Sequence, residues 1–111
     1  TKLNGHDINL NILGFSQGGP TATRWIINNK FKLNSLILWG CDVPNDCLTG
    51  NFKSRWDDFR LIFVIGNTDE YISEEKIKKE REKLNGYGLD YEFYSFDGGH
   101  TIDEPLLKKL I

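Results

Sequence analysis

A serine flanked by glycines is the first feature of this sequence that could carry chemistry. Gly14-Phe15-Ser16-Gln17-Gly18 has the pattern G-x-S-x-G and lies between a strand-like and a helix-like segment. On such a turn the serine hydroxyl is lifted clear of the sheet, and the glycines let neighbouring backbone pass without a Cβ clash. The backbone N–H of Gln17, at the start of the helix, would face a developing oxyanion. The pattern therefore predicts Ser16 as a nucleophile and the Gln17 N–H as an oxyanion-hole donor.

A base must take the proton of the Ser16 hydroxyl, because an alcohol is a weak nucleophile. The sequence contains two histidines, His6 and His100. His6 precedes the strand-like segment that leads to Ser16, so it would lie at the opposite end of that strand, and we interpret it as a solvated loop residue. His100 follows the last strand-like segment. Since the carboxyl ends of parallel strands meet at one edge of a sheet, His100 is the predicted general base.

A carboxylate must hold this imidazole in the correct tautomer and stabilise its cation. Asp69 follows a strongly apolar strand-like segment, on the same predicted edge, and is favoured. Asp42, after an earlier strand, is the alternative, and Glu70 is a secondary candidate. The remaining acidic candidates are interpreted as turn or cap residues: Asp46, Asp97 and Asp103. The resulting chain order, Ser16, Asp69, His100, is the order of the α/β-hydrolase fold.

The elements that must position these side chains alternate between strands and helices. Apolar runs predict strands at 7–13, 35–39, 60–65 and 90–96. Helical spacing predicts helices at 20–29, 74–84 and 104–111, with Ser73 as an N-cap and Gly86 closing the middle helix. The polar connection at 40–59 shows no clear periodicity. Strands that alternate with helices predict an α/β fold, with a mostly parallel sheet of about four strands and flanking helices.

The segment GFSQGG, residues 14–19, resembles the nucleophile elbow of the phospholipase/carboxylesterase family of α/β hydrolases, which includes acyl-protein thioesterases. Residues 66–69 and 97–100 resemble that family's acid and base loops. The resemblance implies hydrolysis of a small-molecule carboxylic ester or thioester through a Ser-His-Asp triad and an acyl-enzyme. It also implies that neither a metal nor an organic cofactor is needed.

The resemblance covers nearly the whole chain but only the second half of the family's domain. The earlier strands, and the loop that supplies the second oxyanion N–H, have no counterpart here. Residues 1–111 are therefore expected to be the C-terminal half of one α/β-hydrolase domain, with its N-terminal strands missing. We expect little or no activity from this half alone, because loss of one oxyanion donor costs ~10²–10³ in turnover. The strand at 7–13 would be an uncovered edge, which predicts self-association.

Three residues are candidates for the wall of a substrate pocket. Phe15 flanks the nucleophile, and Trp39 and Cys41 lie at or just beyond the end of the second strand. The alternative for each is plain core, since aromatic residues beside strands are mostly core. Phe52 and Trp56, in the long polar connection, are candidates for a mobile cover over the site.

Composition and charge weigh against several other classes of protein. The 111 residues carry 14 Lys and Arg against 16 Asp and Glu, a formal net charge of -2 that argues against nucleic acid as the main partner. No apolar run approaches the ~20 residues of a membrane-spanning helix. No secretory signal opens the chain, so a cytoplasmic location is the expectation. Cys41 and Cys47 are expected to be free thiols, and without a nearby histidine they do not predict a zinc site.

The sequence leaves three alternatives to a carboxylic ester hydrolase open. The same fold serves acyl thioesterases and serine peptidases, and the residues quoted above do not separate them. A truncated, non-catalytic relic is the second alternative. The third is a binding module in which residues 14–19 cradle phosphate at a helix N-terminus, although the lysine of a P-loop is missing.

Overall fold

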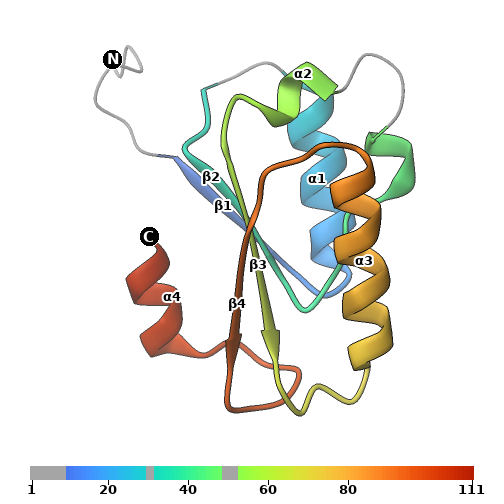
Figure 1. The fold of residues 1–111 in the computed structure, drawn as a ribbon. Coiled ribbons are helices and arrows are strands. Elements are labelled where there is room, and N and C mark those ends of the chain that lie inside the picture. The colour runs from blue at the N-terminus through green and yellow to red at the C-terminus, as the bar shows by residue number, and fades with distance from the viewer. Residues whose placement is uncertain (1–9, 30–31, 49–52) are drawn as a thin grey trace.

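A four-stranded parallel sheet organises the chain (Figure 1). The computed structural model describes residues 10–29, 32–48 and 53–111. The strands are β1 (Asn11–Phe15), β2 (Ser35–Trp39), β3 (Arg60–Gly66) and β4 (Glu92–Phe96), in the spatial order β1-β2-β3-β4. The helices are α1 (Gly18–Asn28), the single turn η1 (Asn45–Cys47), α2 (Lys53–Trp56), α3 (Glu74–Gly86) and α4 (Glu104–Leu110). All three strand pairs are parallel, as the alternation of elements predicted.

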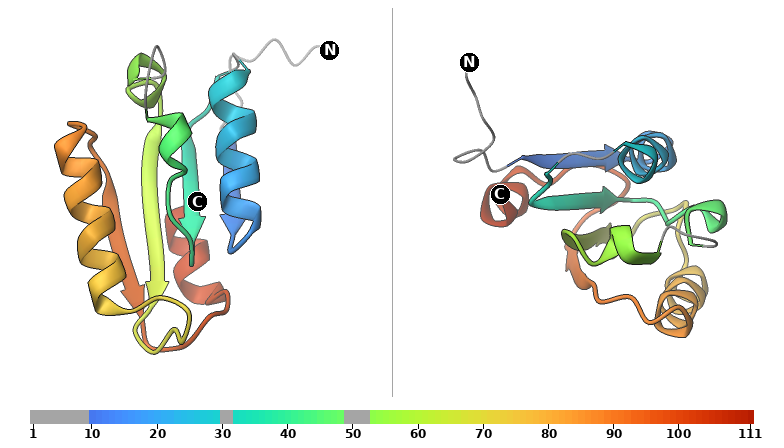
Figure 2. Two further views of the ribbon diagram at one scale, coloured as in Figure 1. Left: turned by 90° about the vertical axis from the view of Figure 1, so that its right-hand side faces the viewer. Right: turned by 90° about the horizontal axis from the view of Figure 1, so that it is seen from above.

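Helices cover both faces of the sheet (Figure 2). On one face, α1 and α3 pack over a core that includes Leu36 and Leu38 of β2 and Leu84 of α3. On the other face, α4 packs over Ile37 and Trp39, the alternate residues of the same strand. Every residue of β2 is buried, which is why its sequence is an unbroken apolar run rather than an alternating one.

The predicted strand at 7–13 is described only from residue 10, and β1 runs from Asn11 to Phe15. His6 lies outside the described residues, so its predicted loop position stays a prediction. The polar Asn11 is accommodated because its Oδ1 accepts hydrogen bonds from the side chains of Asn34 and Ser35. Among the described residues, β1 is paired on one side only and is an edge of the sheet.

Capping side chains explain the boundaries of the helices. Ser73 Oγ accepts a hydrogen bond from Lys76 N at 3.2 Å, as predicted for an N-cap of α3. Asp103 caps α4, a role that the sequence also suggested. The expectation that Gly86 closes α3 is wrong in detail: Gly86 is its last helical residue, and Gly88, with φ of 73°, takes the left-handed conformation.

Two short helical elements lie in the connection at 40–59, η1 and α2, and both are too short to show periodicity in the sequence. Trp56 is 5% exposed and donates from Nε1 to the Cys47 carbonyl at 2.9 Å, so it belongs to the core and not to a mobile cover. Phe52, the other residue considered for that role, lies outside the described residues. Within the described ranges, no helix is long and apolar enough to cross a membrane.

Candidate active site

Three side chains from three loops meet at the carboxyl ends of the strands. Ser16 follows β1, Asp69 follows β3 and His100 follows β4. His100 Nε2 lies 2.9 Å from Ser16 Oγ, and His100 Nδ1 lies 2.7 Å from Asp69 Oδ2. The sequence named these residues in these positions, and the fold brings them within hydrogen-bonding distance in the order that nucleophilic catalysis needs.

The turn that carries Ser16 is strained in the way a nucleophile elbow requires. Ser16 has a φ of 53°, the one positive value among the described non-glycine residues. Such a conformation costs about 1–3 kcal/mol and must be imposed by its surroundings. Ser16 N donates to the Trp39 carbonyl at 2.9 Å, and Gly19 N donates to the Ser16 carbonyl at 3.0 Å. These two bonds hold the turn between β1 and α1.

The glycines of the elbow have unequal roles. A Cβ on Gly14 would lie 2.6 Å from Gly19 Cα, and a Cβ on Gly19 would lie 2.2 Å from Cys41 Sγ, so neither position has room for a side chain. A Cβ on Gly18 would meet nothing within 4 Å. The expectation that both glycines of the pentapeptide prevent clashes is therefore wrong for Gly18. Within the described residues, the close backbone contacts of this turn require glycine at positions 14 and 19 instead.

Gln17 occupies the N-cap position of α1. The first N–H groups of a helix have no acceptor within the helix, and the helix dipole places partial positive charge there. Gln17 lines the same cavity as Ser16. The predicted role of the Gln17 N–H as an oxyanion donor stays a proposal.

Asp69 is fixed through both of its carboxylate oxygens. Its side chain is 1% exposed, and Oδ1 accepts from Tyr71 N at 2.8 Å while Oδ2 faces His100. The two alternatives are both exposed: Asp42 lines the same cavity as Ser16 and His100, and Glu70 is the residue next to Asp69. Of the three acidic candidates, Asp69 is the one whose carboxylate reaches the imidazole.

The loops that carry Asp69 and His100 are bonded to each other. Thr68 N donates to the Gly98 carbonyl at 2.9 Å, and Gly98 N donates to Asn67 Oδ1 at 3.2 Å. A Cβ on Gly66 would lie 2.3 Å from the Gly98 carbonyl oxygen, so glycine is required for this approach. These hydrogen bonds between the two loops fix the distance between Asp69 and His100.

Two aromatic rings flank the His100 imidazole. The Phe15 ring centroid lies 4.9 Å from that of His100, and the Tyr71 ring lies 4.8 Å away. The sequence pointed to Phe15 but missed Tyr71, whose position becomes evident only when its loop folds back over the base.

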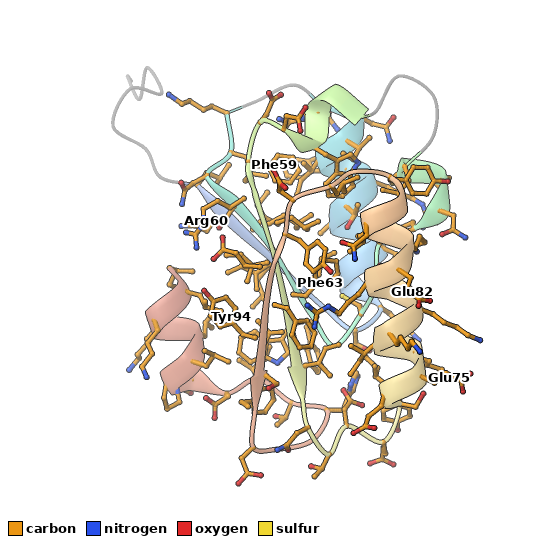
Figure 3. The ribbon with its side chains drawn as sticks, viewed as in Figure 1. Phe59, Arg60, Phe63, Glu75, Glu82 and Tyr94 are labelled. Atoms are coloured by element: carbon orange, nitrogen blue, oxygen red, sulfur yellow. The ribbon has the colours of Figure 1, made fainter. Side chains whose placement is uncertain are left out.

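A cavity of about 530 Å³ adjoins Ser16 and His100 and extends between the sheet and α3. Most of its apolar wall comes from β3, β4, α3 and the segment before α3: Phe63, Ile65, Ile72, Ile77, Leu84 and Phe93. Figure 3 shows Phe63 between the sheet and α3. Sequence reasoning missed these residues, since they lie on separate elements and read as ordinary core.

Of the three residues expected in the pocket wall, Cys41 lines this cavity, and Phe15 and Trp39 do not. Trp39 is 1% exposed and packs on the α4 face, opposite the cavity, because its side chain alternates away from α3. Its Nε1 donates to the Thr101 carbonyl at 2.8 Å. The pocket prediction for Trp39 is therefore corrected: it is core, and it anchors the residue next to His100.

Cys41 and Cys47 are both free thiols, as expected. Burial, with a smaller contribution from the negative charge of Asp42, raises the pKa of the Cys41 thiol to about 12. Cys41 is thus a neutral, packed side chain beside the elbow and not a second nucleophile.

Solved structures share this fold, although no protein-family model and no curated protein matches the sequence. Acyl-protein thioesterase 2 from Zea mays superposes with a TM-score of 0.69 at 18% identity, over 95% of this chain and 54% of that one. The S-formylglutathione hydrolase FrmB from Staphylococcus aureus gives 0.58 at 15% identity, over 90% and 47%. MGS-M1, an α/β hydrolase from a deep-sea metagenome library of the Medee basin, gives 0.51 at 18% identity, over 82% and 39%.

The chain has a partial α/β-hydrolase fold. This confirms the fold expected from the sequence. The chain spans about half the length of these solved structures, or less. At these identities the likeness concerns the fold alone, and the chemistry rests on the residues described above.

Proposed function

We propose that this chain is the catalytic, C-terminal half of a serine hydrolase that cleaves carboxylic esters. The observation that carries the proposal is the continuous contact from Asp69 Oδ2 through His100 to Ser16 Oγ, at 2.7 and 2.9 Å. The positive φ of Ser16 supports it, because strain of this kind concentrates at functional turns. The fold likeness to thioesterases and other hydrolases adds independent support.

The reaction proceeds by two acyl transfers. Asp69 accepts the His100 Nδ1–H, so Nε2 is free to take the proton of the Ser16 hydroxyl as its oxygen attacks the carbonyl carbon. The Gln17 N–H donates to the resulting oxyanion. The tetrahedral intermediate collapses, His100 gives the proton to the leaving alcohol, and an acyl-enzyme forms on Ser16. Water, deprotonated by His100, then attacks this ester, and the carboxylic acid leaves as His100 returns the proton to Ser16 Oγ.

The substrate is an ester with an apolar group beside its carbonyl. The cavity next to the nucleophile has an apolar wall from β3, β4 and α3, which suits a hydrocarbon group. Charged side chains also line the cavity: Asp42, Lys76, Glu80 and Arg81. A thioester is the second candidate, favoured by the TM-score of 0.69 to an acyl-protein thioesterase. The mechanism is the same for both, since they differ in the leaving group, an alcohol or a thiol.

We also propose that the intact domain includes strands that precede this chain. The Zea mays structure carries almost half of its length beyond the matched region, and β1 is an edge in the described sheet. A second oxyanion donor would come from a loop of that missing half. We therefore expect weak turnover from the 111 residues alone, and the edge position of β1 in the described sheet favours association with another strand.

A fluorophosphonate probe tests the proposed nucleophile, because it modifies activated serines without completing a turnover. We expect one covalent adduct on Ser16, seen by mass spectrometry of the purified chain, and none in Ser16→Ala. Ser95→Ala is the matched control, since Ser95 is an exposed serine on β4 and its loss leaves the adduct unchanged. An adduct that persists in Ser16→Ala, or its absence from the wild-type chain, contradicts the proposal.

A panel of p-nitrophenyl esters and acyl thioesters then separates the two substrate classes. The panel is applied to this chain combined with a polypeptide that carries the earlier strands. A higher kcat/KM for thioesters of the same acyl group favours the second candidate. If the 111 residues alone turn over substrate as fast as the combined protein, the proposal that they are half of a domain is refuted.

A further inference from the structure

The turn after β2, residues 40–43, contacts both the nucleophile elbow and the base. Gly40 has a φ of 68°, and its N–H donates to the Val64 carbonyl at 2.8 Å. A Cβ built on Gly40 would lie 3.0 Å from His100 Cε1, so the turn backbone packs directly against the imidazole. Any shift of this turn changes the space available to His100.

The next residue connects the same turn to the elbow. Cys41 Sγ lies 3.5 Å from the Gly14 carbonyl oxygen and occupies the space that a side chain on Gly19 would need. Gly14 precedes the strained turn at Ser16, and Gly19 follows it. The 40–43 turn is therefore wedged between the elbow and His100.

An ion pair on α3 holds the far end of this turn. Glu80 Oε2 accepts from Val43 N at 2.8 Å, and Lys83 Nζ donates to the Val43 carbonyl at 2.8 Å. Lys83 Nζ also contacts Asn45 Oδ1 at 2.9 Å and Glu80 Oε1 at 2.8 Å. The backbone N–H and carbonyl of Val43 are thus both hydrogen-bonded to side chains of α3.

Burial distinguishes this pair from an ordinary helix-surface pair. The Glu80 and Lys83 side chains are 15% and 24% exposed, and Val43 is 1% exposed. The pair Glu75–Lys79 on the same helix is 3.7 Å apart, with both side chains about three-quarters exposed. Figure 3 shows Glu75 and Glu82 on the outer side of α3, away from the sheet. Buried charge-assisted bonds to backbone groups are stronger and costlier to leave unpaired than such surface pairs.

We propose that Glu80 and Lys83 are positioning residues, which clamp the 40–43 turn to α3 and thereby set the orientation of His100 and the elbow. The inference rests on the proposed function for its catalytic consequence. Neither side chain touches the reacting atoms: Glu80 lines the cavity, and both act through Val43. Without the clamp, the Val43 peptide groups need other partners, and the turn relaxes away from Gly14 and His100.

The test compares Lys83→Met with Lys79→Met, which removes a lysine from the exposed pair on the same helix. Fluorophosphonate inactivation is measured over a range of probe concentrations, which separates the limiting rate from the half-saturating concentration. We expect Lys83→Met to lower the limiting rate roughly tenfold with little change in half-saturation, because small misplacements of reacting groups act on the chemical step. Lys79→Met keeps the wild-type rate. Lys83→Arg, which retains donors and charge, restores most of it.

A second readout does not depend on reactivity. The His100 Nδ1–H that bonds to Asp69 gives a far-downfield proton resonance, and we expect it to shift or broaden in Lys83→Met and in Glu80→Gln but not in Lys79→Met. Circular dichroism verifies that each variant is folded. If Lys83→Met does not fold, the Glu80→Gln spectrum decides the question.

The two readouts separate failure of the proposed function from failure of this inference. A wild-type chain that does not react with the probe contradicts the serine hydrolase, and the resonance then still decides whether the clamp orients His100. Unchanged rates and resonances in folded Lys83→Met and Glu80→Gln overturn the positioning role. Equal effects of Lys83→Met and Lys79→Met overturn it as well.

Discussion

His100 Nε2 lies 2.9 Å from Ser16 Oγ, although the two residues are 84 positions apart in the chain. The parallel sheet accounts for this. Each crossover returns the chain to the same end, so the loops after β1, β3 and β4 all open at one edge. The proposed chemistry requires that convergence.

Asp69→Asn should disable the base while leaving the fold intact. An amide facing Nδ1 can stabilise the wrong tautomer of His100 and does not stabilise its cation. A loss of roughly 10⁴ in turnover is the expected order for such a change. The inactivation rate with the fluorophosphonate probe measures it in this chain. Asp42→Asn is the matched control at the cavity rim, and a larger loss in that variant would mean that the wrong carboxylate has been assigned.

Gly14→Ala should destabilise the chain, and Gly18→Ala should not. The new Cβ at residue 14 would lie 2.6 Å from the Gly19 Cα, and overpacking of this kind costs about 1–3 kcal/mol. At residue 18 there is open space within the described part of the chain, and alanine favours the helix by up to about 1 kcal/mol. Urea unfolding of the two variants gives both values, and equal stabilities would show that the elbow does not need this close approach.

Cys41 should resist alkylation in the folded chain. Burial and Asp42 raise its pKa to about 12, so roughly one thiol in 10⁴ is a thiolate near pH 8, and the thiolate is the reactive form. Burial and Asp46 also raise the pKa of the Cys47 thiol. We expect slow reaction of both with iodoacetamide in buffer and rapid reaction in urea, followed by mass spectrometry. Fast native labelling of Cys41 would argue against its close packing on the elbow.

The contribution of Glu92 to stability should depend on pH. Arg60 donates two hydrogen bonds to Glu92, each at 2.7 Å, and this contact lowers the pKa of Glu92 below its ordinary value of 4.5. The unfolded chain therefore takes up the proton first as the pH falls, so the stabilisation is present above about pH 4.5 and is lost below it. Figure 3 shows Arg60 at the end of the sheet where β3 begins.

Glu92→Gln should then be less stable than the wild type near neutral pH, with the difference disappearing towards about pH 3. Both side chains are at least a third exposed, so the neutral-pH difference is expected to stay below about 1 kcal/mol. Urea unfolding at the two pH values measures it. Glu75→Gln, from the exposed pair on α3, serves as the control and should show almost no difference at either pH. A difference for Glu92→Gln that grows in acid would reverse the sign of the argument.

Local patterns were sufficient to predict the larger elements and to nominate the three residues that the fold brings together, Ser16, Asp69 and His100. The run RLIFVI was predictable as a strand because β3 is buried on both faces, and Ser73 was predictable as a cap because N-capping is a local interaction. Short elements such as η1 and α2 were not predictable, since three or four residues show no period. Side-chain alternation along β2 did not reveal which face of the sheet holds the cavity. Trp39 was therefore predicted to line the pocket, although it lies in the core on the opposite face.

By itself, the sequence determined that strands and helices alternate, and it nominated candidates for the chemistry in their chain order. Ser16 and His100 were candidates for nucleophile and base, and Asp69 was favoured over Asp42 as the acid, because each role needs a particular residue type at the end of a strand. The tertiary structure alone decided that Asp69 rather than Asp42 faces the imidazole, that Tyr71 covers it, and that Glu80 and Lys83 reach across to Val43. Those relations join separate elements, and their distances depend on how helices and loops pack on the sheet, which no local pattern encodes.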